Sequence, residues 1–171
     1  MNKDQYVFFD RLYQEYYQRV LSYVRFHTGA GESAEDITSM VFERALTHLA
    51  ELREPDATAA WLFRIARNCV TDAFRRSRPE VSLDELAFME QPRVHSPEAS
   101  ALAREEQRLL LAQVARLSER EREIIGLKFV AHLTNRQIAR VLGVPVGTVG
   151  SLLHRTLGKL RDALTSEGDA P

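Results

Sequence analysis

The stretch TNRQIARVLGVPVGTVGSLLHRTLGKLRDAL, residues 134–164, decides how the C-terminal part of the chain folds. Thr134 and Gln137 stand three residues apart, the spacing at which each side chain can bond the other's backbone N–H and start a helix. Gly143 can adopt the positive φ that ends such a helix, and Pro145 suits the first turn of the next one. The spacing therefore predicts a short helix, a tight turn and a longer helix.

Small and apolar residues in this stretch are spaced like the core of a helix-turn-helix. Ala139 would let the two helices cross closely, and Val149, six residues after Gly143, would fill the gap between them. The short helix is expected over Arg136–Leu142 and the longer one from Pro145 to about Leu164. The other expected core positions are Ile138, Leu142, Val144, Leu153, Leu157 and Leu160.

The N-terminal half of the second helix is the part that a helix-turn-helix places in the major groove of DNA. The stretch has five basic residues and one acidic residue, a net charge of +4, as expected of a nucleic-acid interface. A helical hairpin that binds no DNA can use the same small-residue crossing, and this alternative stays open. The candidate DNA-binding residues are Arg136, Val146, Gly147, Thr148, Gly150, Ser151, His154, Arg155, Lys159 and Arg161.

Proline divides the chain into two helical parts. Three prolines fall between residues 78 and 97, so no long helix can run through this segment. A stretch of about twenty residues without structure is unusual inside one compact domain. The sequence therefore predicts an all-α fold with two small helical domains, residues 1–77 and 98–171, joined by a flexible linker at 78–97. The helix-turn-helix belongs to the second domain.

Apolar residues recur every three or four positions on both sides of the linker, which indicates amphipathic helices. In the first domain these helices run through Tyr6–Val24, Ile37–Leu49 and Trp61–Phe74, with Ser33 as a candidate N-cap of the second. In the second domain a helix is expected over Ala99–Leu117. The next helix starts at a capping box formed by Ser118 and Glu121, with its apolar positions at Ile124, Ile125, Leu127 and Phe129.

Charge is unevenly distributed along the first domain. The window Thr28–Ala60 has seven acidic and two basic residues, a net charge of −5, whereas Trp61–Arg78 has five basic and one acidic, a net charge of +4. Aromatic residues lie among the arginines of the basic window, a composition that suits unstacked bases of single-stranded nucleic acid. The competing interpretation places Trp61 and Phe74 in the core.

Composition excludes several classes of protein. The 171 residues include 23 Lys+Arg and 24 Asp+Glu, a net charge of −1, and 44% are hydrophobic, which excludes a largely disordered chain. No apolar run approaches the ~18 residues that cross a bilayer, and the N-terminus lacks the apolar core of a signal peptide. We therefore expect a cytoplasmic protein without membrane insertion.

The sequence offers no catalytic or metal-binding arrangement. The single cysteine, Cys69, lies on an apolar stripe and is interpreted as a core residue. The five histidines do not have the spacing of metal ligands, and no glycine-rich phosphate or dinucleotide motif is present. We expect no cofactor, no metal and no enzymatic activity.

Four motifs resemble one family. AEDITSMVFERAL (34–46), AWLFRIARNCVTDAFRR (60–76), LSEREREIIGLKF (117–129) and the helix-turn-helix occur in the order found in extracytoplasmic-function (ECF) sigma factors of the sigma-70 family. The resemblance covers Phe8–Arg76 and Arg104–Leu164. It implies a protein that binds core RNA polymerase through the β′ and β subunits and directs promoter recognition and transcription initiation.

The resemblance also assigns roles to residues. The second helix would bind the clamp helices of β′, and the loop Arg53–Ala59 would capture a flipped base of the minus-10 element. The helix-turn-helix would read the minus-35 element of promoter DNA. The core polymerase-binding candidates are Asp36, Ser39, Met40 and Glu43, and the minus-10 candidates are Arg53, Arg64, Asn68, Arg75 and Arg76. An anti-sigma factor is a further partner of many family members, which no residue of the sequence demonstrates.

The chain departs from the family pattern at two places. Ser39 and Met40 stand where the family often has Gln and Glu, a departure that bears on the strength of binding to core polymerase. Gly150 and Leu152 stand where many members have Lys and Arg, which predicts a weaker hold on minus-35 phosphates.

Two other functions fit parts of the sequence. One is a stand-alone helix-turn-helix transcriptional regulator whose N-terminal domain senses a ligand or dimerises. The other is a helical adaptor with no role on DNA. Run-off transcription separates them from a sigma factor, because only a sigma factor directs initiation when core polymerase is added.

Overall fold

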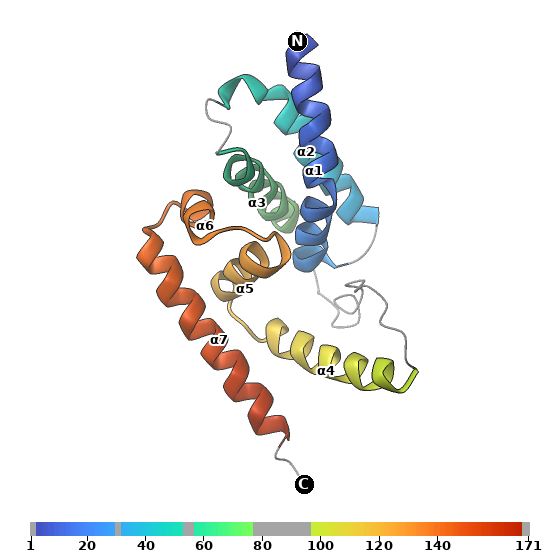
Figure 1. Ribbon diagram of the computed structural model, residues 1–171, viewed down its shortest axis with the longest axis vertical. Helices are drawn as coiled ribbons and strands as arrows, with labels where there is room; N and C mark the ends of the chain where they lie inside the picture. Colours follow the sequence, from blue (N-terminus) through green and yellow to red (C-terminus); the bar gives the residue numbers. More distant parts are fainter. Residues whose placement is uncertain (1–2, 30–31, 53–56, 77–96, 169–171) are drawn as a thin grey trace.

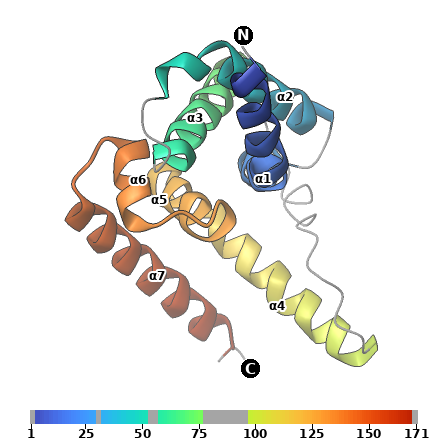
Figure 2. The ribbon, with the colours of Figure 1, turned by 45° about the horizontal axis from the view of Figure 1, so that its top comes forward.

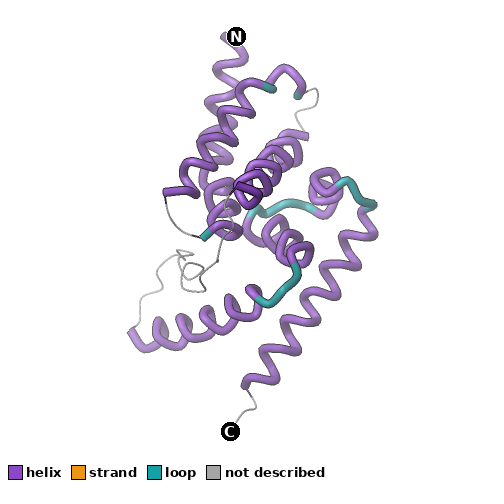
Figure 3. Tube along the Cα trace, turned by 180° about the vertical axis from the view of Figure 1, so that it is seen from behind, coloured by secondary structure: helices purple, strands orange, loops and turns teal. Residues whose placement is uncertain are grey.

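The computed structural model describes residues 3–29, 32–52, 57–76 and 97–168, and these form helices joined by loops, with no strand among them (Figures 1 and 3). The all-α prediction is confirmed. In chain order the elements are α1 (Lys3–Thr28), α2 (Glu32–Thr47), the 3-10 turn η1 (Leu49–Glu51), α3 (Thr58–Arg76), α4 (Pro97–Ala115), α5 (Glu119–Ile125), the π-helical segment η4 (Gly126–Val130), α6 (Asn135–Leu142) and α7 (Val146–Gly168).

Helices α1, α2 and α3 pack together and form the first half of the molecule. Each helix contributes one apolar stripe, as the periodicity predicts, and the buried residues of the three stripes meet in the core. Gly29, at φ 84°, follows the last residue of α1. Helix α2 begins at Glu32, so Ser33 lies inside its first turn, and the prediction that Ser33 is the N-cap is wrong.

The second half begins with α4 and is organised by α5. Ser118 caps α5 as predicted, because its Oγ accepts from the backbone N–H of Glu121 (3.3 Å) and the Glu121 carboxylate accepts from the Ser118 N–H (3.0 Å). The segment η4 follows α5 without a break. Helix α7 packs against α4, α5 and α6 and runs along one side of the molecule (Figure 1).

The π-helical segment η4 changes which side chains are buried. The N–H of Ala131 bonds the carbonyl of Gly126 at 2.9 Å, a span of five residues instead of four. The wider turn rotates the following side chains away from the positions that a 3.6-residue period predicts. Leu127 is buried, but Phe129 is 49% exposed, so the prediction that Phe129 is buried is wrong.

The two halves contact each other. Helix α1 packs on η4, and α3 lies against α6, as Figures 1 and 2 both show. Arg19 of α1 donates two hydrogen bonds to the carbonyl of Ala131, at 3.1 and 2.7 Å. The buried apolar residues of both halves form one continuous cluster. The predicted linker, residues 78–97, lies outside the described residues except for Pro97, which begins α4.

Candidate nucleic-acid interface

The helix-turn-helix is built by two local signals that the sequence predicts. Thr134 Oγ1 accepts from the N–H of Gln137 at 3.3 Å, and Gln137 Oε1 accepts from the N–H of Thr134 at 2.8 Å, which completes a capping box at the start of α6. Gly143 ends α6 with φ 67° and ψ 36°, a conformation that costs little only for glycine. Both caps are confirmed.

The core of the motif holds α6 and α7 at a fixed crossing. Ile138 and Val149 are fully buried, and Ala139 is 7% exposed at the crossing, as expected of a small residue between two close helices. Leu153 and Leu160 are also buried. Leu157 is 42% exposed, so its prediction as a core residue is wrong.

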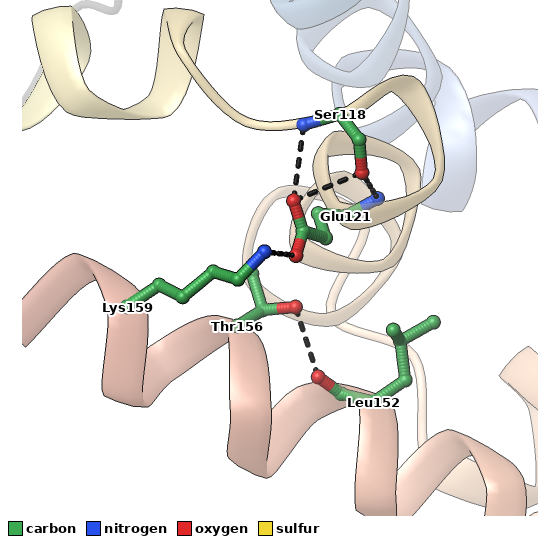
Figure 4. Close-up of polar contacts among 5 residues, drawn as sticks. All are labelled: Ser118, Glu121, Leu152, Thr156 and Lys159. Atoms are coloured by element: carbon green, nitrogen blue, oxygen red, sulfur yellow. Dashed lines mark hydrogen bonds and ion pairs between the residues drawn. The ribbon is translucent and has the colours of Figure 1, made fainter.

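Thr156 is buried on α7 in place of Leu157. Its hydroxyl donates to the carbonyl of Leu152 at 2.9 Å, so the polar group is satisfied inside the helix and its burial carries no unpaired donor (Figure 4). The buried stripe of α7 therefore passes through Val149, Leu153, Thr156 and Leu160, at spacings of three and four.

The first three turns of α7 present an exposed surface. Because these side chains do not contribute to the core, they are free to contact a ligand. The exposed residues at these turns are Val146, Gly147, Ser151, His154 and Arg155, with Thr148 and Gly150 half-buried beside them. Arg136 is exposed on α6. The structure brings these candidates together on one side of the motif, and their contact with minus-35 DNA stays a prediction.

A shallow cleft lies beside the start of α7. Arg136 and Arg140, one turn apart on α6, line it together with the Gly143–Val146 turn. Two guanidinium groups next to a helix N-terminus favour an anion such as a DNA phosphate. Arg140 is not among the sequence candidates, although its spacing of four residues from Arg136 is a signal that could have found it.

The burial of Leu152 contradicts the prediction that it stands where a cation would hold a minus-35 phosphate. It is 8% exposed and faces the core, so it does not stand at a position where a cation would reach a phosphate. Gly150 is different, because a Cβ built there meets no atom within 4 Å. Of these two departures from the family pattern, only Gly150 therefore occupies a position that a basic side chain could fill.

Lys159 is engaged within the domain. Its Nζ pairs with the Glu121 carboxylate of α5, the same carboxylate that completes the Ser118 cap (Figure 4). These hydrogen bonds, above all the one from Lys159, lower the pKa of Glu121 to about 2. The pair ties α7 to α5, and Lys159 can reach DNA only by leaving this partner.

The exposed face of α3 carries the minus-10 candidates that the structure describes. Arg64, Asn68 and Arg75 are exposed at spacings of four and seven, which places them along one side of the helix. Arg53 lies outside the described residues, and of Arg76 the structure describes only that it ends α3.

A cleft between α2 and α3 lies beside these residues. It is lined by Arg44 of α2, by His48, which precedes η1, and by Trp61, Arg64, Ile65 and Asn68 of α3. Arg44 pairs with Asp72 at 3.2 Å. Sequence reasoning missed Arg44 and His48 because they fall in the acidic window. Trp61 is 7% exposed, so its interpretation as a core residue is confirmed, whereas Phe74 is half-buried and packs against the edge of the core.

The acidic candidates share one face of α2. Asp36, Ser39 and Glu43 are exposed and Met40 is half-buried, while the intervening Ile37, Thr38, Val41 and Phe42 are buried. Asp36 and Glu43 therefore make this side of α2 acidic, whereas the exposed side of α3 carries Arg64 and Arg75. Binding of this α2 face to polymerase stays a prediction.

Three further observations concern metal binding, the thiol of Cys69 and membrane-spanning helices. In the described part of the chain, no three histidine, cysteine, aspartate or glutamate side chains are grouped so as to hold a metal ion. Cys69 is buried, and burial raises the pKa of its thiol, as expected of a core cysteine. Within the same residues, no helix is long and apolar enough to cross a bilayer.

Comparison with known families and proteins identifies both halves of the chain. The Sigma-70 region 2 family matches residues 12–80, and the Sigma-70, region 4 family matches residues 107–160. The ECF RNA polymerase sigma factor BldN of Streptomyces coelicolor is 33% identical over 161 residues, which cover 93% of this chain and 61% of BldN. The chain thus spans less than two thirds of that relative. The ECF RNA polymerase sigma factor SigL of Mycobacterium tuberculosis is 31% identical over 159 residues, which cover 92% of this chain and 89% of SigL.

Two solved structures have the same fold. The sigma factor RpoE of Bartonella quintana, in complex with the anti-sigma factor NepR, has a TM-score of 0.68 at 21% identity, covering 92% of this chain and 96% of RpoE. CnrH, in complex with the cytosolic domain of CnrY, has a TM-score of 0.64 at 21% identity, covering 95% of this chain and 89% of CnrH. The family matches and the relatives agree with the motifs and with the helix-turn-helix geometry, and the chain belongs to the ECF RNA polymerase sigma factors of the sigma-70 family.

Proposed function

We propose that the chain binds core RNA polymerase through the exposed face of α2 and recognises promoter DNA through α3 and the helix-turn-helix. This assignment of one surface to polymerase and two surfaces to DNA rests on where the charged side chains lie. The acidic α2 face would repel DNA phosphates but can meet a protein, whereas α3, α6 and α7 expose arginines that attract phosphates.

Each surface is assigned by its own residues. Asp36, Ser39, Met40 and Glu43 would contact the β′ subunit. Arg64, Asn68 and Arg75 would contact the minus-10 element, together with Arg53 and Arg76. The first three turns of α7, with Arg136 of α6, would contact the minus-35 element. The chain catalyses no reaction of its own in this proposal and acts in the cytoplasm, where it meets polymerase.

The experiment that tests this proposal is run-off transcription with purified core polymerase. The chain should direct initiation only when core polymerase is present. Specific DNA binding without polymerase, at two palindromic half-sites, would instead support a stand-alone helix-turn-helix regulator.

Asp36→Arg tests the α2 assignment separately. The substitution reverses the charge of an exposed side chain, so the helical fold should persist while co-purification with core polymerase falls. Asp162→Arg makes the same charge change at an exposed position on α7 and should leave co-purification unchanged. Equal recovery of polymerase with Asp36→Arg and with the parent chain would contradict the assignment.

An anti-sigma factor is a further proposed partner. Its support is indirect, since RpoE, which has the same fold, was solved with the anti-sigma factor NepR. Co-purification of the native chain from its own cells would identify such a partner.

A further inference from the structure

A cleft lies where α3, α5 and the turn between α6 and α7 meet, and the three helices lie together in two views (Figures 1 and 2). Its volume of about 370 Å³ falls in the range of small-molecule sites, roughly 300–1,000 Å³, which often lie between domains. The charged residues that line it belong to none of the surfaces proposed above. The lining residues that matter here are Arg67 of α3, Glu119, Arg120 and Glu123 of α5, and Leu142 and Val144.

The two guanidinium groups of the cleft have donors to spare. Arg67 Nε is buried, although the side chain is 42% exposed, and it lies 3.7 Å from Glu123 Oε1 without a hydrogen bond in the described part of the chain. Arg120 is exposed, and within the same residues it takes part in no hydrogen bond or ion pair. Because a guanidinium donates in a planar fork that matches a carboxylate, a carboxylate in this cleft would satisfy these donors.

Two carboxylates line the same cleft one helical turn apart. Glu119 and Glu123 are four residues apart on α5, a spacing at which like charges repel. Burial raises the pKa of Glu123, and the charge of Glu119 acts in the same direction. The Tyr23 hydroxyl donates to Glu123 Oε1 at 2.7 Å, and the nearest nitrogen of His27 lies 3.7 Å from Oε2. An ammonium group between the two carboxylates would relieve their repulsion and donate to both.

The remaining wall of the cleft is apolar. Leu142 is the last residue of α6, and Val144 lies in the turn that leads to α7. Both are half-buried and pack against the core, so each is held in place and still exposes part of its side chain. An aliphatic group that covers this exposed surface gains free energy through the hydrophobic effect.

We propose that the cleft is a binding site for a free α-amino acid with an aliphatic side chain, such as leucine. The guanidinium groups would bind its carboxylate, the α5 carboxylates its ammonium group, and the apolar wall its side chain. A simple anion would leave the two glutamates without a counterion, and a simple cation would leave the two arginines without one. The inference does not depend on the proposed function, because it concerns residues outside the polymerase and DNA surfaces.

Isothermal titration calorimetry of the full chain with L-leucine tests the proposal, and saturable binding is expected. Three smaller probes each lack one group: 3-methylbutylamine lacks the carboxylate, 4-methylpentanoate lacks the ammonium group, and glycine lacks the side chain. Each should bind about tenfold or more weakly than leucine, because one kind of lining residue then stays without its partner. Absence of saturable binding by leucine, isoleucine and valine would overturn the proposal, and so would a probe that binds as tightly as leucine.

Two substitutions place the ligand in this cleft. Arg120→Gln and Glu119→Gln should each raise the Kd for leucine about tenfold, because each removes a charged partner of the zwitterion. Both side chains are exposed, so the helical circular dichroism should stay at the parent value. Arg11→Gln on α1 and Glu106→Gln on α4 are the matched controls, since they make the same changes at exposed positions outside the cleft.

The melting temperature gives a second readout on the same proteins. A ligand that binds only the folded chain stabilises it, so saturating leucine should raise the melting temperature of the parent and of both controls. The rise should be smaller in Arg120→Gln and Glu119→Gln at the same leucine concentration. A Kd that stays at the parent value in either cleft variant would overturn the assignment of leucine to this cleft.

Discussion

Glu121→Gln should weaken the second half of the molecule while strengthening its hold on DNA. The carboxylate accepts from the Ser118 N–H at 3.0 Å and from the Ser118 hydroxyl at 2.9 Å, and it pairs with Lys159 of α7. Glutamine has the same length and keeps an acceptor for the cap, but it removes the charge that holds Lys159. The substitution therefore separates the ion pair from the capping interaction.

The expected loss of stability follows from the exposure of the pair. The Lys159 side chain is 63% exposed and that of Glu121 is 13% exposed. Solvent around the lysine screens the pair, so its contribution is about 0.2–1 kcal/mol. The negative charge of Glu121 in the first turn of α5 adds about 0.3–1 kcal/mol through the helix dipole. Urea unfolding at pH 7, followed by circular dichroism, should therefore show a free energy of unfolding lower by about 0.5–2 kcal/mol.

The pH dependence has a definite sign. The pKa of Glu121 is lowered to about 2 in the folded chain from an ordinary value of 4.5, so the folded state binds fewer protons than the unfolded state between these values. The contribution is complete above about pH 5 and is lost as the pH falls toward 2. The difference between parent and variant should shrink over the same range.

The gain on DNA comes from the released lysine. With its partner neutralised, Lys159 can reach a phosphate, so affinity for a minus-35 duplex should rise and the salt dependence should steepen by up to ~0.9 in log–log slope. Lys159→Gln is the control, since it removes the same pair without supplying a free cation. If the double variant Glu121→Gln/Lys159→Gln loses as much unfolding free energy as the two single variants together, Glu121 and Lys159 are not coupled. An unchanged salt slope in Glu121→Gln would refute the release of Lys159 to a phosphate.

Three further outcomes are expected. Leu153→Ala should cost about 2–5 kcal/mol of unfolding free energy in urea titrations, because Leu153 is buried between α7 and its neighbours. Gly150→Lys should tighten binding to a minus-35 duplex across a salt series, whereas Leu152→Arg would bury a cation and should lower the melting temperature instead. Burial and the nearby Arg122 and Arg67 lower the pKa of His27 to about 3 from an ordinary value of 6.5. The unfolded chain therefore binds a proton below pH 6.5 that the folded chain does not, and the free energy of unfolding falls as the pH is lowered from there. The stability advantage of the parent over His27→Gln should narrow by about 1.4 kcal/mol from pH 7.5 to 5.5 in urea titrations; an unchanged difference would contradict the burial of a neutral imidazole.

The parts of the fold that local chemistry decides could be predicted from the sequence. The Thr134 and Ser118 capping boxes and the turn at Gly143 depend on side chains within three residues of the backbone groups that they satisfy. The spacing of small and apolar residues around Val149 likewise depends only on helix geometry. These features identify the helix-turn-helix before any tertiary contact is known.

The structure contradicts two predicted core residues, Phe129 and Leu157, and both predictions assume a regular 3.6-residue period with apolar residues on the buried face. The π-helical segment inserts an extra residue per turn, so Phe129 leaves the buried face that a 3.6-residue period assigns to it. On α7 the buried stripe through Val149, Leu153 and Leu160 includes Thr156, whose hydroxyl bonds a carbonyl of its own helix, and leaves Leu157 exposed. Polarity alone favours the opposite assignment, since an apolar residue is usually the buried one of such a pair.

The contact between the halves could not be predicted from local sequence. Glu123 stands in SEREREI, residues 118–124, where alternating acidic and basic residues suggest a solvated surface. Nothing within several residues of Glu123 indicates that Tyr23, a hundred positions earlier, covers it. The contact depends on tertiary packing, which a single sequence does not reveal.

The long separation of these contacts has a consequence for synthesis of the chain. Arg19 and the Ala131 carbonyl are 112 positions apart, and Tyr23 and Glu123 are 100 apart. A ribosome adds about 5–20 residues per second, so after residue 76 completes α3, roughly 3–11 seconds pass before residue 131 is made. During this interval the Tyr23 hydroxyl, Phe26 and His27 lack the contacts with Glu123 and Gly126 that the second half supplies. The nascent first half therefore presents an apolar surface to chaperones until translation supplies the segment that covers it.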